Sequence, residues 1–130
     1  MIKFENVSVT YPGGVEALKD LNLEIKDGDF IIIVGLSGAG KSTLLRTVNN
    51  LVKPSTGSVY LEGKNVTSAK KKELKKIRSQ IGMIFQTFNL VNRSTVLKNV
   101  LTGRLSNIST IRSILGLWPK DQKEMAFEAL

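Results

Sequence analysis

A short stretch in the first half of the chain has the residue types and spacing of a phosphate-binding loop. It reads Gly35-Leu36-Ser37-Gly38-Ala39-Gly40-Lys41-Ser42 and fits the pattern Gly-x-x-x-x-Gly-Lys-Ser. Small residues let the backbone turn so that successive N–H groups point at phosphate oxygens. The loop therefore predicts binding of ATP, or of a similar nucleoside triphosphate, together with Mg²⁺.

The polar residues at the end of this loop have individual predicted contacts. Lys41 is expected to reach the β- and γ-phosphates as a positive charge. A helix beginning near Lys41 would direct the positive end of its dipole at the same anion. Ser42 offers a hydroxyl oxygen to Mg²⁺, and Thr43 is placed to bond near the α-phosphate. The other nucleotide-binding positions are Gly35, Ser37, Gly38, Ala39 and Gly40.

A phosphate-binding loop lies between a buried strand and a helix, and the sequence predicts both elements. Residues 30–34 are apolar at every position, as expected of a strand covered on both faces in a parallel sheet. The following apolar positions fall at helical spacing: Leu44, Leu45, Val48, Leu51 and Val52. This context favours a phosphate loop over a glycine-rich turn that holds no ligand.

Other segments predict an antiparallel β layer and several further helices. Alternating apolar and polar residues indicate strands with one exposed face. The further predicted strands cover residues 2–11, 21–25, 58–61 and 81–85, and the further predicted helices cover about 70–79, 95–104 and 121–130. The fold class expected from these elements is α/β.

Composition narrows the classes of protein to consider. The chain has 130 residues and no cysteine, which excludes disulfides and thiolate metal sites. The N-terminus lacks a secretory pattern, and the longest apolar run is too short to cross a bilayer, so we expect a cytoplasmic protein. Much of the net charge of +8 lies in residues 70–78. No aromatic residue interleaves these charges, which favours a solvated helix face over a nucleic-acid partner.

Several segments, in the right order, resemble the nucleotide-binding subunit of ABC transporters. Besides the loop, these are Phe4-Glu5-Asn6-Val7, Tyr11-Pro12-Gly13-Gly14, Ala17-Leu18-Lys19-Asp20-Leu21-Asn22-Leu23, Lys53-Pro54-Ser55-Thr56-Gly57-Ser58-Val59 and Ile81-Gly82-Met83-Ile84-Phe85-Gln86. The resemblance implies a P-loop NTPase (RecA-like) core with an antiparallel β subdomain, over residues 1–90. Residues 91–130 would then begin a helical subdomain.

The resemblance also implies roles for residues outside the loop. Tyr11 would stack on adenine, although a tyrosine at a strand end can also simply pack on the sheet. Gln86 would contact Mg²⁺ or the attacking water and would share the catalytic role with Lys41. Without the resemblance, an amide at a strand end would be interpreted as an ordinary capping group. The region from Gln86 to Leu90 would meet the transmembrane permease, although Phe88 and Leu90 equally suit core packing. Members of the family work as dimers, which implies a homodimer.

Two stretches, residues 35–46 and 88–105, are most similar to importers for phosphonates. Methionine and polar amino-acid importers share much of the first stretch, so an importer of that type is the alternative. The implied function is ATP binding as the energy-coupling subunit of an importer. Such a subunit is cytoplasmic and peripheral on the inner face of the membrane, where the permease holds it.

The sequence departs from the family in its second half. Subunits of this family are nearly twice as long, and the Leu-Ser-Gly-Gly-Gln signature, the Walker B strand with its Asp, the catalytic Glu and the switch His are not found here. The sequence has no histidine at all. We therefore expect a truncated, incomplete domain with exposed apolar surface, which hydrolyses ATP very slowly or not at all. The alternative is a nucleotide-binding fragment without catalysis.

Overall fold

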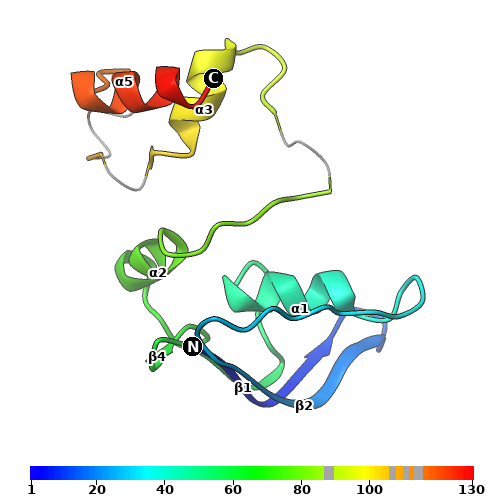
Figure 1. Ribbon diagram of the computed structural model, residues 1–130. Helices are drawn as coiled ribbons and strands as arrows, with labels where there is room; N and C mark the ends of the chain where they lie inside the picture. Colours follow the sequence, from blue (N-terminus) through cyan, green and yellow to red (C-terminus); the bar gives the residue numbers. More distant parts are fainter. Residues whose placement is uncertain (87–89, 106–107, 110–111, 113–115) are drawn as a thin grey trace. The chain divides into compact units, whose positions relative to one another are not determined.

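The computed structural model describes residues 1–86, 90–105, 108–109, 112 and 116–130. These residues form two compact units, Met1–Ile81 and Gly82–Leu130. Figure 1 follows the chain through both units. The expected division at residue 90 stays a prediction.

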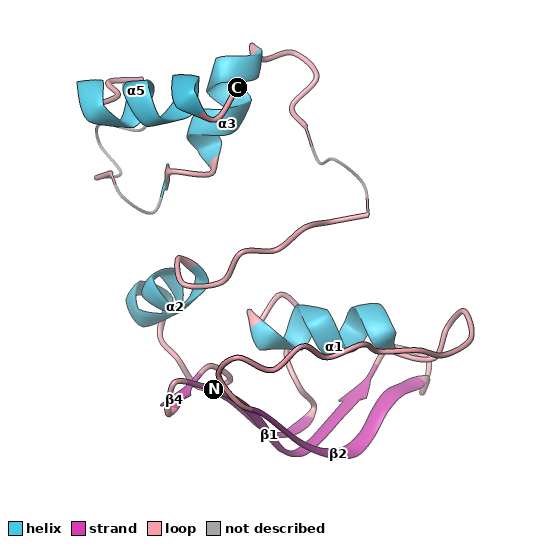
Figure 2. Cartoon of the chain, viewed as in Figure 1, coloured by secondary structure: helices cyan, strands magenta, loops and turns pink. Residues whose placement is uncertain are grey.

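The first unit is built on an antiparallel sheet, as the sequence predicts. Its strands are β1 (Ile2–Thr10), β2 (Glu16–Ile25), β3 (Thr56–Leu61) and β4 (Lys64–Asn65), and their order across the sheet is β2-β1-β3-β4. Every neighbouring pair is antiparallel, and Figure 2 shows these strands in magenta. The predicted β layer is therefore confirmed.

A bulge in β1 directs its apolar side chains into one core. Phe4 pairs with Leu23 of β2, but the next pair is Val7 with Leu21, so β1 has one residue more than β2 at this point. Without this extra residue, Val7 and Phe4 would point to opposite faces of the sheet. The bulge places both side chains on the same face. Both Phe4 and Val7 are buried as a result, together with Val59 of β3.

Helix α1 (Lys41–Val48) packs on this sheet through Leu44, which belongs to the buried core. Figure 1 shows α1 lying along one face of the strands. The helix is confirmed, but its predicted apolar stripe is partly wrong, because Leu45 and Leu51 are exposed. Thr43 and Thr47 are buried in their place. The Thr47 hydroxyl can be buried because it donates a hydrogen bond to the Leu44 carbonyl at 2.7 Å.

Helix α2 (Lys71–Arg78) is the predicted basic helix with a narrow buried stripe. Ile77 is buried and Leu74 is half-buried, while the lysines are exposed. Arg78 donates from Nε to the Asn49 carbonyl at 2.9 Å and from Nη2 to the Asn50 carbonyl at 3.0 Å. A positive group at the carboxyl end of α1 satisfies carbonyls that have no partner within the helix.

Two predicted strands do not form. Residues 30–34 and 81–85 have no strand structure. Phe30 is 87% exposed and Ile84 is fully exposed, so the expectation of a strand covered on both faces was wrong for this chain. A strand needs neighbours for its N–H and C=O groups, and no described strand pairs with either segment. The expected exposed apolar surface, in contrast, is present.

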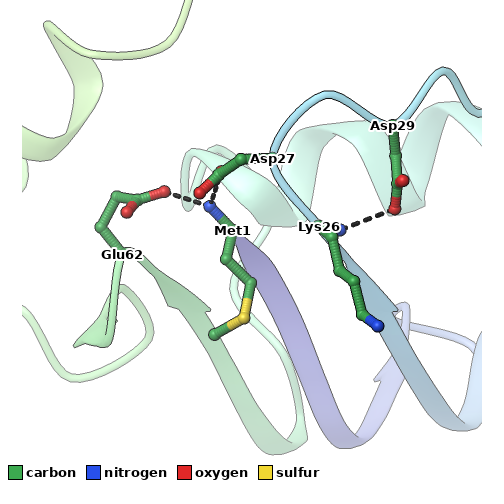
Figure 3. A network of polar contacts seen from close by, with 5 residues as sticks. All are labelled: Met1, Lys26, Asp27, Asp29 and Glu62. Atoms are coloured by element: carbon green, nitrogen blue, oxygen red, sulfur yellow. Dashed lines mark hydrogen bonds and ion pairs between the residues drawn. The ribbon is translucent and has the colours of Figure 1, made fainter.

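The N-terminus ties two turns of the first unit together. Figure 3 shows the Met1 ammonium group between the carboxylates of Asp27 and Glu62, with which it forms ion pairs. Met1 also accepts a hydrogen bond at its carbonyl from the Glu62 N–H at 3.0 Å. These contacts hold the chain just after β2 close to the turn between β3 and β4.

The second unit contains α3 (Val96–Thr102) and α5 (Lys120–Glu128), in agreement with the helices predicted over 95–104 and 121–130. The Thr95 hydroxyl caps α3 by accepting a hydrogen bond from the Lys98 N–H at 3.3 Å. Arg104 Nε donates to Gln122 Oε1 of α5 at 3.0 Å. None of the helices in the described ranges is long and apolar enough to cross a membrane.

Candidate functional site

The predicted phosphate loop immediately precedes α1, which begins at Lys41. The Ala39 N–H donates to the Leu36 carbonyl at 3.2 Å and closes the turn. Gly38 and Gly40 have φ angles of 81° and 84°, a left-handed conformation that glycine adopts without steric cost. The loop therefore has the curled backbone that the sequence predicts.

Gly40 is fixed by a close approach as well as by its backbone angles. A Cβ atom at this position would lie 2.1 Å from the carbonyl oxygen of Ala17 in β2. No L side chain fits such a distance. The second glycine of the motif thus allows the loop and the start of α1 to pass directly against the sheet.

The side chain of Lys41 folds back over the loop. Its Nζ donates to the carbonyl of Gly35 and to the carbonyl of Leu36, each at 2.6 Å. Two neutral carbonyls hold the ammonium group without neutralising its charge. The charge therefore lies within the turn that residues 35–40 form, where an anion bound by the loop would meet it.

The amino end of α1 carries no group that competes with an anion. No side chain caps it, and its first turn contains no acidic residue. The first N–H groups of a helix have no partner within the helix and bind anions well. Ser42 lies exposed in this turn, with a hydroxyl oxygen of the kind that Mg²⁺ prefers. The residues present therefore fit a phosphate chain and a hydroxyl-bound magnesium ion.

Tyr11 lies beside the same turn of α1. Its hydroxyl oxygen is 3.1 Å from Oγ1 of Thr43, although the two residues are far apart in sequence. Thr43 is buried, whereas the Tyr11 side chain is partly exposed. The structure thus brings the predicted aromatic residue together with the predicted phosphate-binding residues.

The remaining predicted site residues belong to the second unit. Gln86 and Leu90 are exposed there. Phe88 lies outside the described residues. Within the part of the chain that the structure describes, no group of three or more acidic, His or Cys side chains could hold a metal ion.

Sequence reasoning missed three backbone carbonyls that shape this site and one pairing of side chains. The carbonyls of Gly35 and Leu36 hold Lys41, and the carbonyl of Ala17 sets the space at Gly40. Backbone atoms are the same at every position, so no residue type marks them. The Tyr11–Thr43 contact joins two residues that were each predicted, but its pairing depends on how β1 and α1 pack.

Comparison with known proteins decides the family. A family model described as ABC transporter matches residues 18–129. The chain belongs to the ABC transporter family. The match includes the whole phosphate loop and α1, so the geometry above is that of a member of this family.

Several curated relatives from this family are similar over the full chain. It is 56% identical over 130 residues to the phosphonates import ATP-binding protein PhnC of Bacillus thuringiensis, and 50% identical to PhnC 3 of Halalkalibacterium halodurans. All of this chain is covered, but only 51% and 50% of those proteins, respectively. The chain therefore spans about half the length of the curated relatives it matches.

Solved structures confirm the fold class of a partial P-loop ABC domain. A dimeric, post-hydrolysis structure of the ATP-binding cassette MJ0796 bound to ADP and Pi has a TM-score of 0.82 and is 37% identical to this chain. The match covers 98% of this chain and 55% of that one. The structure of cbiO1 from Clostridium perfringens, part of the cbiONQ transporter complex, has a TM-score of 0.66 at 30% identity, covering 95% and 46%.

Proposed function

We propose that this chain binds MgATP and forms the phosphate-binding half of an energy-coupling subunit of an ABC importer. The observation that carries the proposal is the loop of residues 35–40. Its backbone is left-handed at Gly38 and Gly40, Gly40 lies directly against the sheet, and the Lys41 ammonium group bonds to the carbonyls of Gly35 and Leu36. The uncapped start of α1 follows the loop directly. This arrangement suits a chain of phosphates better than any neutral ligand.

Each site residue has a proposed task in nucleotide binding. The backbone amides of residues 35–40 bind phosphate oxygens, and Lys41 moves its ammonium group from the two carbonyls to the β- and γ-phosphates. Thr43 bonds near the α-phosphate, and the exposed part of the Tyr11 ring stacks on adenine. Ser42 would hold a bound Mg²⁺, which would supply positive charge against the phosphates, and a contact of Gln86 with this ion stays a prediction from the sequence.

The activity and partners of the whole subunit are further proposals. The importer would carry phosphonates, which is supported by the names of the relatives from Bacillus and Halalkalibacterium. An amino-acid or methionine importer is the alternative. The region from Gln86 to Leu90 would contact the permease, and the subunit would pair with a second copy on the cytoplasmic side of the membrane. The dimeric MJ0796 cassette supports the pairing.

Titration calorimetry with MgATP tests the binding proposal. Lys41→Ala should weaken binding by at least about tenfold, because hydrogen bonds to a charged group contribute about 1.5–3 kcal/mol. Lys72→Ala in α2 is the matched control. Each variant lowers the formal net charge from +8 to +7, but Lys72 is exposed and lies on a helix outside the loop. No heat with the folded wild-type chain, or equal weakening by both variants, would refute the proposal.

Hydrolysis is expected to be very slow for this chain by itself. Phosphoryl transfer needs a positioned water and stabilised transition-state charge, and of the residues proposed for this task the chain contributes Lys41 and Gln86. Phosphate release should therefore stay near the uncatalysed background at saturating MgATP. Turnover typical of a complete transport ATPase would contradict this expectation. It would also exclude the alternative that the chain is a nucleotide-binding fragment without catalysis.

A further inference from the structure

The contact between Tyr11 and Thr43 has a geometry that goes beyond adenine stacking. The Tyr11 hydroxyl lies 3.1 Å from Oγ1 of Thr43. Thr43 is only 7% exposed and belongs to the first turn of α1, next to Lys41 and Ser42. A ring that served only to stack on a base would need no hydroxyl directed at the phosphate side of the site.

The backbone around Tyr11 restricts where its ring can lie. The Tyr11 N–H donates to the Val15 carbonyl at 2.9 Å, and the Tyr11 carbonyl accepts from the Gly14 N–H at 3.1 Å. These two bonds close a tight loop in which Gly13 and Gly14 have φ angles of 95° and 80°. With the backbone held in this way, the hydroxyl contact with Thr43 sets the direction of the side chain.

The donor and acceptor order of this pair becomes fixed once a phosphate is bound. Each hydroxyl has one hydrogen to donate and can accept through its lone pairs. A phosphate oxygen only accepts, so Thr43 must give its hydrogen to the phosphate. Tyr11 then donates to Thr43, and the two bonds form a chain that ends on the phosphate. Successive hydrogen bonds of this kind polarise and strengthen one another.

We propose that the Tyr11 hydroxyl is a positioning group that acts through Thr43 on the phosphates and so couples base binding to phosphate binding. The proposal rests on the proposed function, since it assumes that the loop holds a nucleotide. Tyr11 is then a two-part residue. Its ring contacts the base, and its hydroxyl orients Thr43.

A phosphate ligand that lacks a nucleobase distinguishes the contribution of the Tyr11 hydroxyl from that of its ring. We propose titration calorimetry with MgATP and with magnesium tripolyphosphate on the wild-type chain, Tyr11→Phe, Thr43→Val and the double variant. Tyr11→Phe keeps the ring and should weaken both ligands, by about fivefold to tenfold, as expected for one hydrogen bond. In the Thr43→Val background, Tyr11→Phe should weaken either ligand by no more than about twofold, because the hydroxyl has lost its target.

Two outcomes of these titrations would overturn the proposal. One is unchanged tripolyphosphate binding by Tyr11→Phe, which would leave Tyr11 with stacking alone. The other is additive loss in the double variant, which would mean that the two hydroxyls act separately. Failure of the proposed function is distinguishable, because the wild-type chain would then bind neither ligand and Lys41→Ala would change nothing.

Folding of the variants needs a separate check, since Thr43 is buried. Far-UV circular dichroism and the thermal midpoint would identify a variant that has lost its fold. Thr43→Ser keeps the hydroxyl, so in the Thr43→Ser background Tyr11→Phe should weaken binding as strongly as in the wild-type chain. A purely structural role of Thr43 would not predict this result. If the effect of Tyr11→Phe in the Thr43→Ser background were as small as in the Thr43→Val background, the proposal would be wrong.

Discussion

Two apolar segments of the first unit have opposite fates. Strand β1 mixes apolar and polar residues, yet its Phe4, Val7 and Val9 are among the most buried side chains. Residues 30–34 are apolar throughout, yet they form no strand and Phe30 is largely exposed. Hydrophobicity along the sequence is higher in the second segment, so hydrophobicity by itself does not decide which segment is buried.

The difference lies in the partners that each segment has. β1 pairs with β2 on one side and with β3 on the other, and α1 covers the core face. Its backbone groups are satisfied and its side chains are enclosed at the same time. None of the described strands pairs with residues 30–34. A parallel strand is stable only when neighbouring strands and covering helices are all present.

The same substitution in both segments should have very different effects on stability. Phe4→Ala should lower the free energy of unfolding by about 3–5 kcal/mol, because it removes a buried ring and leaves a cavity. Phe30→Ala should change it by less than about 0.5 kcal/mol, because the ring is already in water. Urea denaturation followed by circular dichroism measures both values. Losses of similar size would show that Phe30 is buried in solution.

The glycines of the loop lie where the exposed segment meets the packed sheet. Gly40→Ala should cost about 2–5 kcal/mol, since it combines a left-handed backbone with a clash against the Ala17 carbonyl. Gly38→Ala, which has the same backbone strain but open space around its Cβ, should cost about 1–2 kcal/mol. Urea denaturation of the two variants side by side provides the check. A larger loss for Gly38→Ala would mean that the loop packs differently against β2.

The smallest predicted effect concerns the ion pairs that hold the start of the exposed segment to the sheet. The Met1 ammonium group donates hydrogen bonds to the carboxylates of Asp27 and Glu62, and these bonds raise its pKa above the ordinary value of 8.0. Because the folded state holds the proton more tightly, this stabilisation is complete below about pH 8 and is lost as the pH rises through the raised pKa. The carboxylates are exposed, so the effect is small.

Thermal midpoints between pH 7 and pH 11 measure that loss. The wild-type chain should lose a small part of its thermal stability across this range, beyond the change seen in the double variant Asp27→Asn, Glu62→Gln. That variant keeps the amino group but lacks both carboxylates, so other titrations affect both proteins alike. Parallel curves for the two proteins would show that the amino group contributes nothing measurable to the stability of the fold.

Most of the local structure could be predicted from the sequence. The alternation in residues 2–11 predicts β1, and the spacing of Leu74 and Ile77 predicts the buried stripe of α2. The glycine pattern predicts the loop and the start of α1 at Lys41. These features depend on neighbours along the chain, such as the period of a strand or the conformational freedom of glycine, and residue types report them directly.

The phosphate loop, the antiparallel layer and the family can be predicted from the sequence, because motif spacing and strand periodicity are local properties. Three features arise from tertiary packing: residues 30–34 are exposed, Thr43 and Thr47 replace Leu45 on the buried face of α1, and the Tyr11 hydroxyl contacts Thr43. Those outcomes depend on which segments are present to pack against one another. Contacts between distant residues have no counterpart in the spacing of residues along a single chain.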